Sequence, residues 1–448
     1  MTISFKRKLI VLIAIFMLTA CGTSDYLPAY PSADDVESPT SPITSETDPA
    51  PGQQEEAFTE AIPFKYEAAS PFKEGAAVVG IGDRENGYKW GFIDMAGKEI
   101  VPAIYDGAQS FREGLAAVML DGKWGFINKS GEEAVPLLYD EVSAFSEGFA
   151  AVLLHAEDGI SLWRYIDKTG EEILPPRYEI ANKFIDGLAI VGYGPGSSPT
   201  LGFIDKTGKE VIPLQYDYAS PFSEGYACVG MGNIVHGYEC GFIDKAGNLV
   251  VPMIYDINIH MSEGMSAVSI SSFSHELGMP IRLFGFIDTA GNEVIPPEYN
   301  SASYFLEGMA RVGLNNRGLK YGFIDLEGNE VIPLIYDEAR LYRGGMAAVK
   351  IDGKWDFIDK TGNEIISSRK DARRYDEAES FSEGFAVVGR LALQDGIFPC
   401  RKWGFIDKTG KEIMPLMYDG AQSFSEGLAA VMLGGKWGYI SLPQDTVY

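Results

Sequence analysis

The chain has few of the residues from which metal and catalytic sites are commonly built, with only 4 cysteines and 4 histidines among 448 residues. Beyond Cys21, the spacing of Cys228, Cys240 and Cys400 fits no metal-binding pattern, and the sequence has no glycine-rich phosphate-binding loop. The histidines have no cysteine, serine or carboxylate partner at a recognisable spacing. We therefore expect no metal, no cofactor and no enzymatic activity. Cys228 and Cys240 could form a disulfide in an oxidising compartment, which the sequence leaves open.

Long apolar runs and positive charge are also scarce. The apolar run Leu9–Leu18 follows the basic residues Lys6, Arg7 and Lys8, and it is shorter than the roughly 20 residues of a membrane-spanning helix. This pattern is typical of a secretory signal peptide, which we expect over residues 1–20. Without its three basic residues, 34 Lys and Arg face 63 Asp and Glu, a formal charge of −29 (34 − 63). That charge excludes nucleic acid as a partner, disfavours anionic lipid head groups and favours a basic protein.

A short motif ends the apolar run. Leu18-Thr19-Ala20-Cys21-Gly22 resembles the lipobox of bacterial lipoproteins. The resemblance implies cleavage before Cys21 and attachment of diacylglycerol to its thiol. Two or more acyl chains on one residue give stable anchoring, so we expect an extracytoplasmic protein held at the bacterial membrane by a lipid on Cys21. The alternative is an ordinary signal peptide followed by a chance cysteine.

The next segment has the composition of a linker. Between Gly22 and Glu60 the chain has six prolines, nine acidic residues and no Lys or Arg. Such a segment cannot bury enough apolar surface to fold, so residues 21–61 are predicted to form a disordered, self-repelling tether. The folded part is expected over residues 62–448.

Internal repeats dominate residues 62–448. The segment Lys123–Asn128 (Lys-Trp-Gly-Phe-Ile-Asn) recurs in related form ten times, and so does a turn that is usually Glu-Gly, as at Glu113-Gly114. A tyrosine precedes each of these turns by nine residues. The distance from the Glu-Gly turn to the next Trp-Gly segment varies, whereas the remainder of the unit has a nearly constant length. Insertions therefore collect at one point of the repeat, as in arrays whose variable loops share one face.

The local pattern predicts strands. In one unit, the apolar run Leu115–Leu120, an Asp-Gly turn and Lys123–Ile127 form a hairpin signal. A tight turn such as Asp205–Gly208 and a third run that stops at a proline such as Pro213 complete the unit, because proline marks a strand end or an edge. Each unit is thus predicted to be a three-stranded antiparallel meander followed by a fixed connector.

The tryptophans indicate how the units pack. All six occupy one repeat position, where other units have Leu, Cys, Phe or Tyr, and this favours a structural repeat core over a sugar- or proline-binding stripe: Trp90, Trp124, Trp163, Trp355, Trp403 and Trp437. Both strand faces are mainly apolar, so successive meanders must stack. We expect an all-β fold of ten meanders, stacked as a propeller-like or a solenoid array. The sequence does not distinguish a closed ring from an open spiral.

The repeated motifs resemble a known family. Copies of Lys-Trp-Gly-Phe-Ile-Asp, with Pro-x-x-Tyr-Asp and Glu-Gly-x-Ala-Ala-Val, are similar to the bacterial WG repeat family over residues 62–448. The resemblance implies β-rich repeat arrays, often on exported proteins, without a common activity. Arg164 and Asp356 depart from the pattern at the glycine, and Gly344 departs from it at the glutamate.

Two sets of repeated acids have competing interpretations. Asp or Asn recurs at the second turn, from Asp94 to Asp407, as a calcium ladder would require, but one carboxylate per turn favours a turn-opening role. The glutamates of the Glu-Gly turns could act with these aspartates in glycoside hydrolysis. With Asp186 at the same position of one unit, an acid recurs there nine times, which is more consistent with a structural role.

The two longest insertions are the candidate binding loops. Residues 269–283 contain Phe273, His275 and Arg282, and residues 389–402 contain Phe398 and Arg401. Aromatic and arginine side chains carry much of the energy of protein interfaces, although long loops can also be merely tolerated. We expect a scaffold that binds an envelope protein. A module that binds cell-wall glycan and a structural spacer without ligand are the alternatives.

Overall fold

The computed structural model describes residues 59–83, 87–155, 161–194, 198–233, 237–258, 260–274, 279–315, 318–365, 375–394 and 398–441. All of them belong to one unit of the chain, residues 55–448. Every regular element in these ranges is a β-strand, and none of these residues forms a helix capable of crossing a bilayer. The expected signal peptide, Cys21 and most of the expected tether lie outside the described residues. The first strand begins at Thr59, three residues before the expected start of the array.

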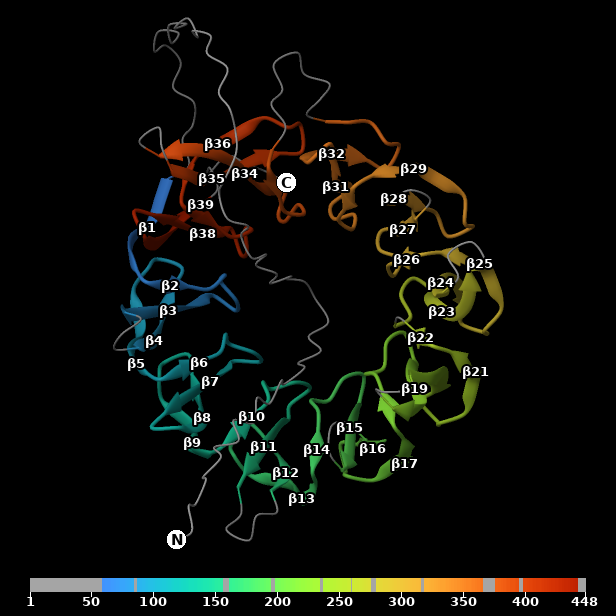
Figure 1. Cartoon of the computed structure of the whole chain (residues 1–448). Helices are drawn as coiled ribbons and strands as arrows, with labels where there is room; N and C mark the ends of the chain where they lie inside the picture. Colours follow the sequence, from blue (N-terminus) through green and yellow to red (C-terminus); the bar gives the residue numbers. More distant parts are fainter. Residues whose placement is uncertain are drawn as a thin grey trace, which may run out of the picture. The chain divides into compact units, whose positions relative to one another are not determined.

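Ten small antiparallel sheets are arranged around a centre as the blades of a β-propeller (Figure 1). Each blade has two long strands that form a hairpin, as the apolar runs and turn signals predict. The first hairpin strands are β3 (Ala76–Asp83), β7 (Leu115–Leu120), β11 (Ala150–Leu154), β15 (Leu188–Tyr193), β19 (Tyr226–Asn233), β23 (Met265–Ser274), β27 (Ala310–Asn315), β31 (Met346–Ile351), β34 (Phe385–Gln394) and β38 (Leu428–Leu433). Their partners are β4 (Gly87–Asp94), β8 (Lys123–Asn128), β12 (Leu162–Ile166), β16 (Thr200–Asp205), β20 (Gly237–Asp244), β24 (Met279–Asp288), β28 (Leu319–Ile324), β32 (Lys354–Asp359), β35 (Phe398–Asp407) and β39 (Lys436–Ser441).

In nine blades two further strands flank the hairpin, so these blades have four strands rather than the three expected. Nearest the centre lies a two-residue strand from the connector: β2 (Ala68–Ala69), β6 (Gly107–Ala108), β10 (Glu141–Val142), β14 (Ile180–Ala181), β18 (Tyr218–Ala219), β22 (Ile257–Asn258), β26 (Ser301–Ala302), β30 (Glu338–Ala339), β33 (Glu377–Ala378) and β37 (Gly420–Ala421). At the rim lie β5 (Glu99–Tyr105), β9 (Glu133–Tyr139), β13 (Glu172–Tyr178), β17 (Glu210–Tyr216), β21 (Leu249–Tyr255), β25 (Glu293–Tyr299), β29 (Glu330–Tyr336), β36 (Glu412–Tyr418) and β1 (Thr59–Tyr66). Within the described part of the chain, the eighth blade has three strands, β30, β31 and β32.

The ring is closed by its two ends. Strand β1 pairs with β39, so the N-terminal strand completes the last blade in the order β1-β39-β38-β37. The sequence left open whether the array was a ring or a spiral, and this pairing settles it as a ring. Below, the blade built from β2 to β5 is the first, and the composite blade is the tenth.

We had expected the proline near the end of the unit to stop its strand, but in nine blades it lies within the rim strand. Pro213 is the fourth residue of β17, and the register between β16 and β17 shifts around it, from Phe203↔Ile212 to Leu201↔Tyr216. The rim strand has no partner on its outer side, so the missing N–H of proline costs no ladder hydrogen bond. Proline also makes this exposed edge a poor template for pairing with another chain.

The shifted register explains the glycine of the Trp-Gly pair. A Cβ on Gly125 would lie 2.6 Å from the backbone oxygen of Val135 and 2.7 Å from the backbone of Pro136. The bulged rim strand therefore crosses so close to this position that only glycine fits without a shift of the backbone.

The cores lie between blades, one at each of the ten junctions. At the junction of the first two blades, Phe92 and Val101 pack against Phe111 and Val118. At the closing junction, Tyr439 of the tenth blade packs against Phe72. Each blade is thus covered on both faces, as the apolar character of both strand faces predicted.

Candidate functional site

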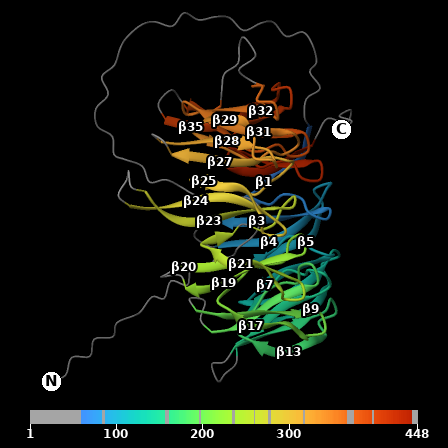
Figure 2. The same ribbon diagram turned by 90° about the vertical axis from the view of Figure 1, so that its right-hand side faces the viewer.

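The antiparallel order of the strands sorts the loops onto two sides of the ring. The hairpin loops, such as Asp121-Gly122 between β7 and β8, and the connectors after the rim strands lie on one side, which we call the hairpin face. The Glu-Gly turns and the turns between the hairpin and rim strands lie on the other side, which we call the turn face. Apart from five extra residues between Asp356 and Gly384, the length varies mainly at the hairpins: β23 and β24 have ten residues each, whereas β7 and β8 have six. The β23–β24 hairpin accordingly extends beyond its neighbours in Figure 2.

The candidate binding residues fall on two hairpins that are not neighbours. Phe273 lies in β23 and Arg282 in β24 of the sixth blade, whereas Phe398 and Arg401 lie in β35 of the ninth. His275 lies outside the described residues. The structure therefore places both candidate loops on the hairpin face but does not bring them together into one site (Figure 1).

Both arginines contact acids of their own blades. Arg282 lies 4.0 Å from the carboxylate of Asp256, and Arg401 lies 3.3 Å from that of Glu377. The Arg401 guanidinium is also 5.8 Å from the ring centre of Trp403. These contacts hold the guanidinium groups against the blades, with the remaining surface of each side chain facing solvent.

The connector aspartate joins successive blades on the hairpin face. Asp140 accepts a hydrogen bond from the Lys123 ammonium at 2.7 Å and another from the His155 N–H in the next hairpin at 2.8 Å. Lys123 first, and then His155 N–H, hold the pKa of Asp140 below its usual value. Equivalent contacts of a lysine with the connector acid join Lys89 to Asp106, Lys320 to Asp337, Lys354 to Asp376, Lys402 to Asp419 and Lys436 to Glu67.

The tryptophans lie at the margins of the cores rather than at their centres. Trp355 is buried, with 3% of its surface exposed, but the other five indoles are half-buried and pack against the interblade clusters. The centres are formed by phenylalanine and tyrosine pairs such as Phe126 and Phe145, whose ring centres are 4.7 Å apart.

The repeated aspartates of the second turn have a local role. The Asp205 carboxylate accepts hydrogen bonds from Thr207 N–H at 2.9 Å and from Lys209 N–H at 3.1 Å. Each turn thus contains its own acceptor, which is the turn-opening role that the sequence favoured. Within the ranges that the structure describes, no group of three potential metal ligands comes together.

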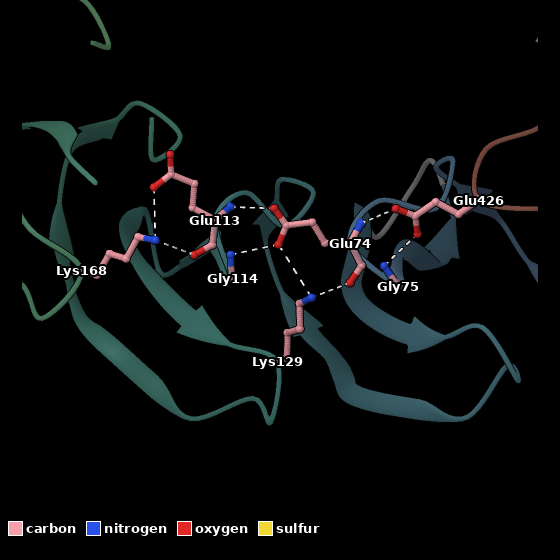
Figure 3. A network of polar contacts seen from close by, with 7 residues as sticks. All are labelled: Glu74, Gly75, Glu113, Gly114, Lys129, Lys168 and Glu426. Atoms are coloured by element: carbon pink, nitrogen blue, oxygen red, sulfur yellow. Dashed lines mark hydrogen bonds and ion pairs between the residues drawn. The ribbon is translucent and has the colours of Figure 1, made fainter. Parts of the chain in front are cut away.

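At eight of the ten junctions, the glutamate of a Glu-Gly turn links its blade to the next, as Figure 3 shows for Glu74, Glu113 and Glu426. Both turn residues have positive φ, 53° at Glu113 and 86° at Gly114, so their N–H groups point toward the preceding blade. The Glu74 carboxylate accepts both, at 2.6 and 2.9 Å. Six junctions have this two-bond contact, through Glu74, Glu113, Glu224, Glu307, Glu383 and Glu426. At two more junctions, Glu147 and Glu263 accept from the glycine N–H.

A lysine from the second turn adds charge to several of these contacts. The Lys168 ammonium donates to the Glu113 backbone oxygen at 2.9 Å and lies 3.2 Å from its carboxylate. Burial opposes ionisation of Glu113, but Lys168 and the N–H groups of Gly148 and Glu147 outweigh it and hold the pKa of Glu113 below its usual value. A general acid must hold a proton that it can donate. The Glu113 carboxylate is ionised and its oxygens already accept hydrogen bonds from the next blade, so it is not suited to general acid catalysis.

Two junctions lack the contact. Asp186 replaces glutamate in the fourth blade, and its shorter side chain pairs with Lys245 at 2.5 Å. Gly344 replaces glutamate in the eighth blade and supplies no carboxylate to the turn Glu383-Gly384. In the sequence, Gly344 is only a departure from the repeat. Its structural consequence becomes clear only from the N–H groups that the missing carboxylate would have bound.

Known proteins provide limited comparisons. The chain matches none of the curated proteins. Among solved structures, a eukaryotic initiation factor has a TM-score of 0.40 at 10% identity, covering 59% of this chain and 76% of that one. The tricorn protease has a TM-score of 0.24 at 12% identity, with 83% and 46% covered. AztD from Citrobacter koseri has a TM-score of 0.29 at 14% identity, with 67% and 90% covered. Likenesses this remote carry no inference about activity.

The family comparison is extensive. Ten segments match the model of the WG containing repeat: residues 56–84, 90–124, 124–155, 163–194, 202–233, 241–271, 284–317, 321–355, 357–389 and 403–437. Each segment begins in the outer strands of one blade and ends in the hairpin of the next, as 90–124 does from β4 to β8. Because the ten segments cover more than half of the chain, the protein belongs to the WG repeat family.

Proposed function

We propose that this protein is a non-enzymatic scaffold that binds a partner protein at the bacterial cell envelope through its hairpin face. The observation that carries the proposal is the concentration of length variation at the hairpin loops, to which the five extra residues between Asp356 and Gly384 are the exception. The connector acids and Glu-Gly turns keep a nearly constant spacing because they hold the blades together, whereas the hairpin loops are under no such constraint. Variable loops on a rigid frame are the usual place for recognition.

The anchoring part of the proposal is supported by the N-terminal sequence alone. The lipobox-like Leu18–Gly22 implies a lipid on Cys21, and the acidic tether would hold the ring away from the membrane surface. Replacing Cys21 by Ala in the full chain should release the protein from the membrane fraction. A C21A protein that stays membrane-bound would contradict the anchor.

The charge of the chain indicates the kind of partner. A net charge of −29 after the signal peptide favours a basic protein, whose association should slow as salt rises and screens the attraction. Binding to a neutral glycan through stacking would be insensitive to salt.

The test is capture from an envelope extract, with residues 55–448 as bait. The control bait has the β23–β24 and β34–β35 hairpins shortened to the six-residue strands and Asp-Gly turn of β7–β8. A protein retained by the first bait and lost from the second would support the scaffold and locate the site. Retention of glycan fragments only would favour the carbohydrate module, and retention of nothing by either bait would favour the spacer.

A further inference from the structure

The turn face contains one junction with the binding groups for a carboxylate but without the carboxylate. In the ninth blade, the turn Glu383-Gly384 has the same conformation as the other Glu-Gly turns, with φ of 49° and 85°. Ser382 and Phe385 close it with mutual backbone hydrogen bonds of 2.8 and 3.0 Å, as in the other blades. At six junctions the two N–H groups of such a turn are bound by the preceding blade's glutamate, and at two more the glutamate binds the glycine N–H. Here that position is Gly344, and no side chain among the described residues accepts from Glu383 N–H or Gly384 N–H.

The lysine of this junction is also in place. Lys408 occupies the same turn position as Lys129, Lys168 and Lys360, which lie 3.7, 3.2 and 3.7 Å from the glutamates of their junctions. Its ammonium lies 3.2 Å from the point where a Cβ on Gly344 would be. It has no ion pair with any described acid, and its side chain is exposed, as are Gly344 and Glu383. Two N–H donors and a cation therefore converge on a solvent-accessible position.

We propose that this junction binds a carboxylate from outside the chain, in the position that a glutamate occupies in the other blades. The internal copies define the ligand chemistry. In six junctions each of the two N–H groups bonds one oxygen of a single carboxylate, as Glu147 and Gly148 do with Glu113 at 2.5 and 3.0 Å. A planar carboxylate therefore fits, and its source is either a small carboxylic acid or the side chain of an acidic peptide. The site lies on the turn face and is independent of binding at the hairpin face.

The fourth-blade junction serves as a natural control. There the donors Glu224 N–H and Gly225 N–H also lack a glutamate, but Asp186 keeps a carboxylate beside Lys245. An added anion would meet this carboxylate and an already paired lysine, so we expect no binding at that junction.

Selective isotope labelling tests the site in the intact protein. Carbonyl-¹³C glutamate with ¹⁵N glycine makes only Glu-Gly pairs visible by NMR, and the sequence has nine: eight turn glycines and Gly328. Titration with propionate, which corresponds to the glutamate side chain from Cβ outward, should shift the Gly384 signal saturably and leave Gly225 and Gly328 unmoved. Acetamide or propionamide at the same concentrations should have no effect.

Two variants make the result decisive. Gly344→Glu supplies the carboxylate in cis at a position where the other blades hold Glu at φ of 49–56°, and it should abolish the response to propionate. Lys408→Met keeps the N–H donors and should weaken propionate binding about fivefold, the size of an exposed ion-pair contribution. A blocked Gly-Glu-Gly peptide that binds more tightly than propionate would identify a peptide side chain as the source, and equal or weaker binding a small acid. No Gly384 shift, equal shifts at all nine glycines, an equal effect of the neutral amides, or an unchanged response in G344E would each overturn the proposal.

Discussion

Replacing Glu113 by Ala tests whether the carboxylate contacts between blades stabilise the ring. In the wild type, the Glu113 carboxylate binds Glu147 N–H and Gly148 N–H of the next blade and lies 3.2 Å from Lys168. The substitution removes the acceptor but leaves both donors and the cation. Because the donors belong to a turn fixed by its own backbone hydrogen bonds, they cannot move to other acceptors in the protein.

The expected loss follows from the number and exposure of these bonds. Hydrogen bonds to a charged group contribute about 1.5–3 kcal/mol each. The Glu113 side chain is 31% exposed, so water partly replaces the lost acceptor and the lower end of this range applies. For two bonds at about 1.5 kcal/mol each, with roughly 0.5 kcal/mol for the partly solvated ion pair, the free energy of unfolding should fall by about 3.5 kcal/mol.

Equilibrium unfolding in urea measures this loss, with Glu171→Ala as the matched control. Glu171 lies on the same face, is exposed and carries the same charge, but its side chain makes no hydrogen bond or ion pair with another described residue. E171A should change the free energy of unfolding by less than about 0.5 kcal/mol. A double-mutant cycle with Lys168→Met isolates the ion pair. If E113A is no less stable than E171A, the interblade carboxylate contacts do not stabilise the ring.

Three further changes test other parts of the fold. Gly125→Ala places a methyl group against the backbone of Val135 and Pro136 and should cost about 1–3 kcal/mol in urea unfolding; an unchanged midpoint would show that the rim strand yields freely. A chain that starts at Glu67 lacks β1, including the buried Ile62 and Tyr66, and should melt at a lower temperature, with recovery when a peptide of residues 59–66 is added. Recovery by a scrambled peptide would contradict this. Finally, a hydrogen bond from the Thr361 hydroxyl lowers the pKa of Asp359 to about 2, although burial alone would raise it. A hydrogen bond from Lys123 likewise lowers the pKa of Asp140. Because these pKa values are depressed in the folded state, their stabilisation is present above pH 4 and is lost as the pH falls toward 2; a melting temperature constant from pH 5 to 2 would refute it.

The sequence predicted the parts of the fold that repeat and missed those that depend on pairing. The hairpins follow from pairs of apolar runs separated by Asp-Gly or other glycine-containing turns. The number of units follows from the ten copies of the Trp-Gly segment and of the Glu-Gly turn. The two-residue inner strands are too short for any periodicity to show. The rim strands were wrongly predicted to end at proline. The register shift that accommodates Pro213 depends on pairing with the neighbouring strand, which the sequence of one strand does not show.

Closure of the ring has a signal in the order of the repeated motifs. The array begins with Pro63 and Tyr66, which occupy the Pro-x-x-Tyr positions of a rim strand, before any Trp-Gly segment. The first rim strand thus has no hairpin of its own unit before it. The Glu-Gly turns were correctly assigned a structural role, but their contact with the next blade depends on positive φ at both turn residues, which the residue types alone do not specify for glutamate.

The composite tenth blade has a consequence for the order of folding. In the other blades, contacts such as Lys123 with Asp140 join residues 17 apart, whereas Tyr439 binds the backbone oxygen of Ser70 across 369 residues. The loop closed by Tyr439 and Ser70 is more than four doublings longer than the loop closed by Lys123 and Asp140. Closing it therefore costs about 2.5 kcal/mol of additional chain entropy. Nine blades can therefore form from local contacts as the chain emerges, and the seam should be the last to form and the first to open.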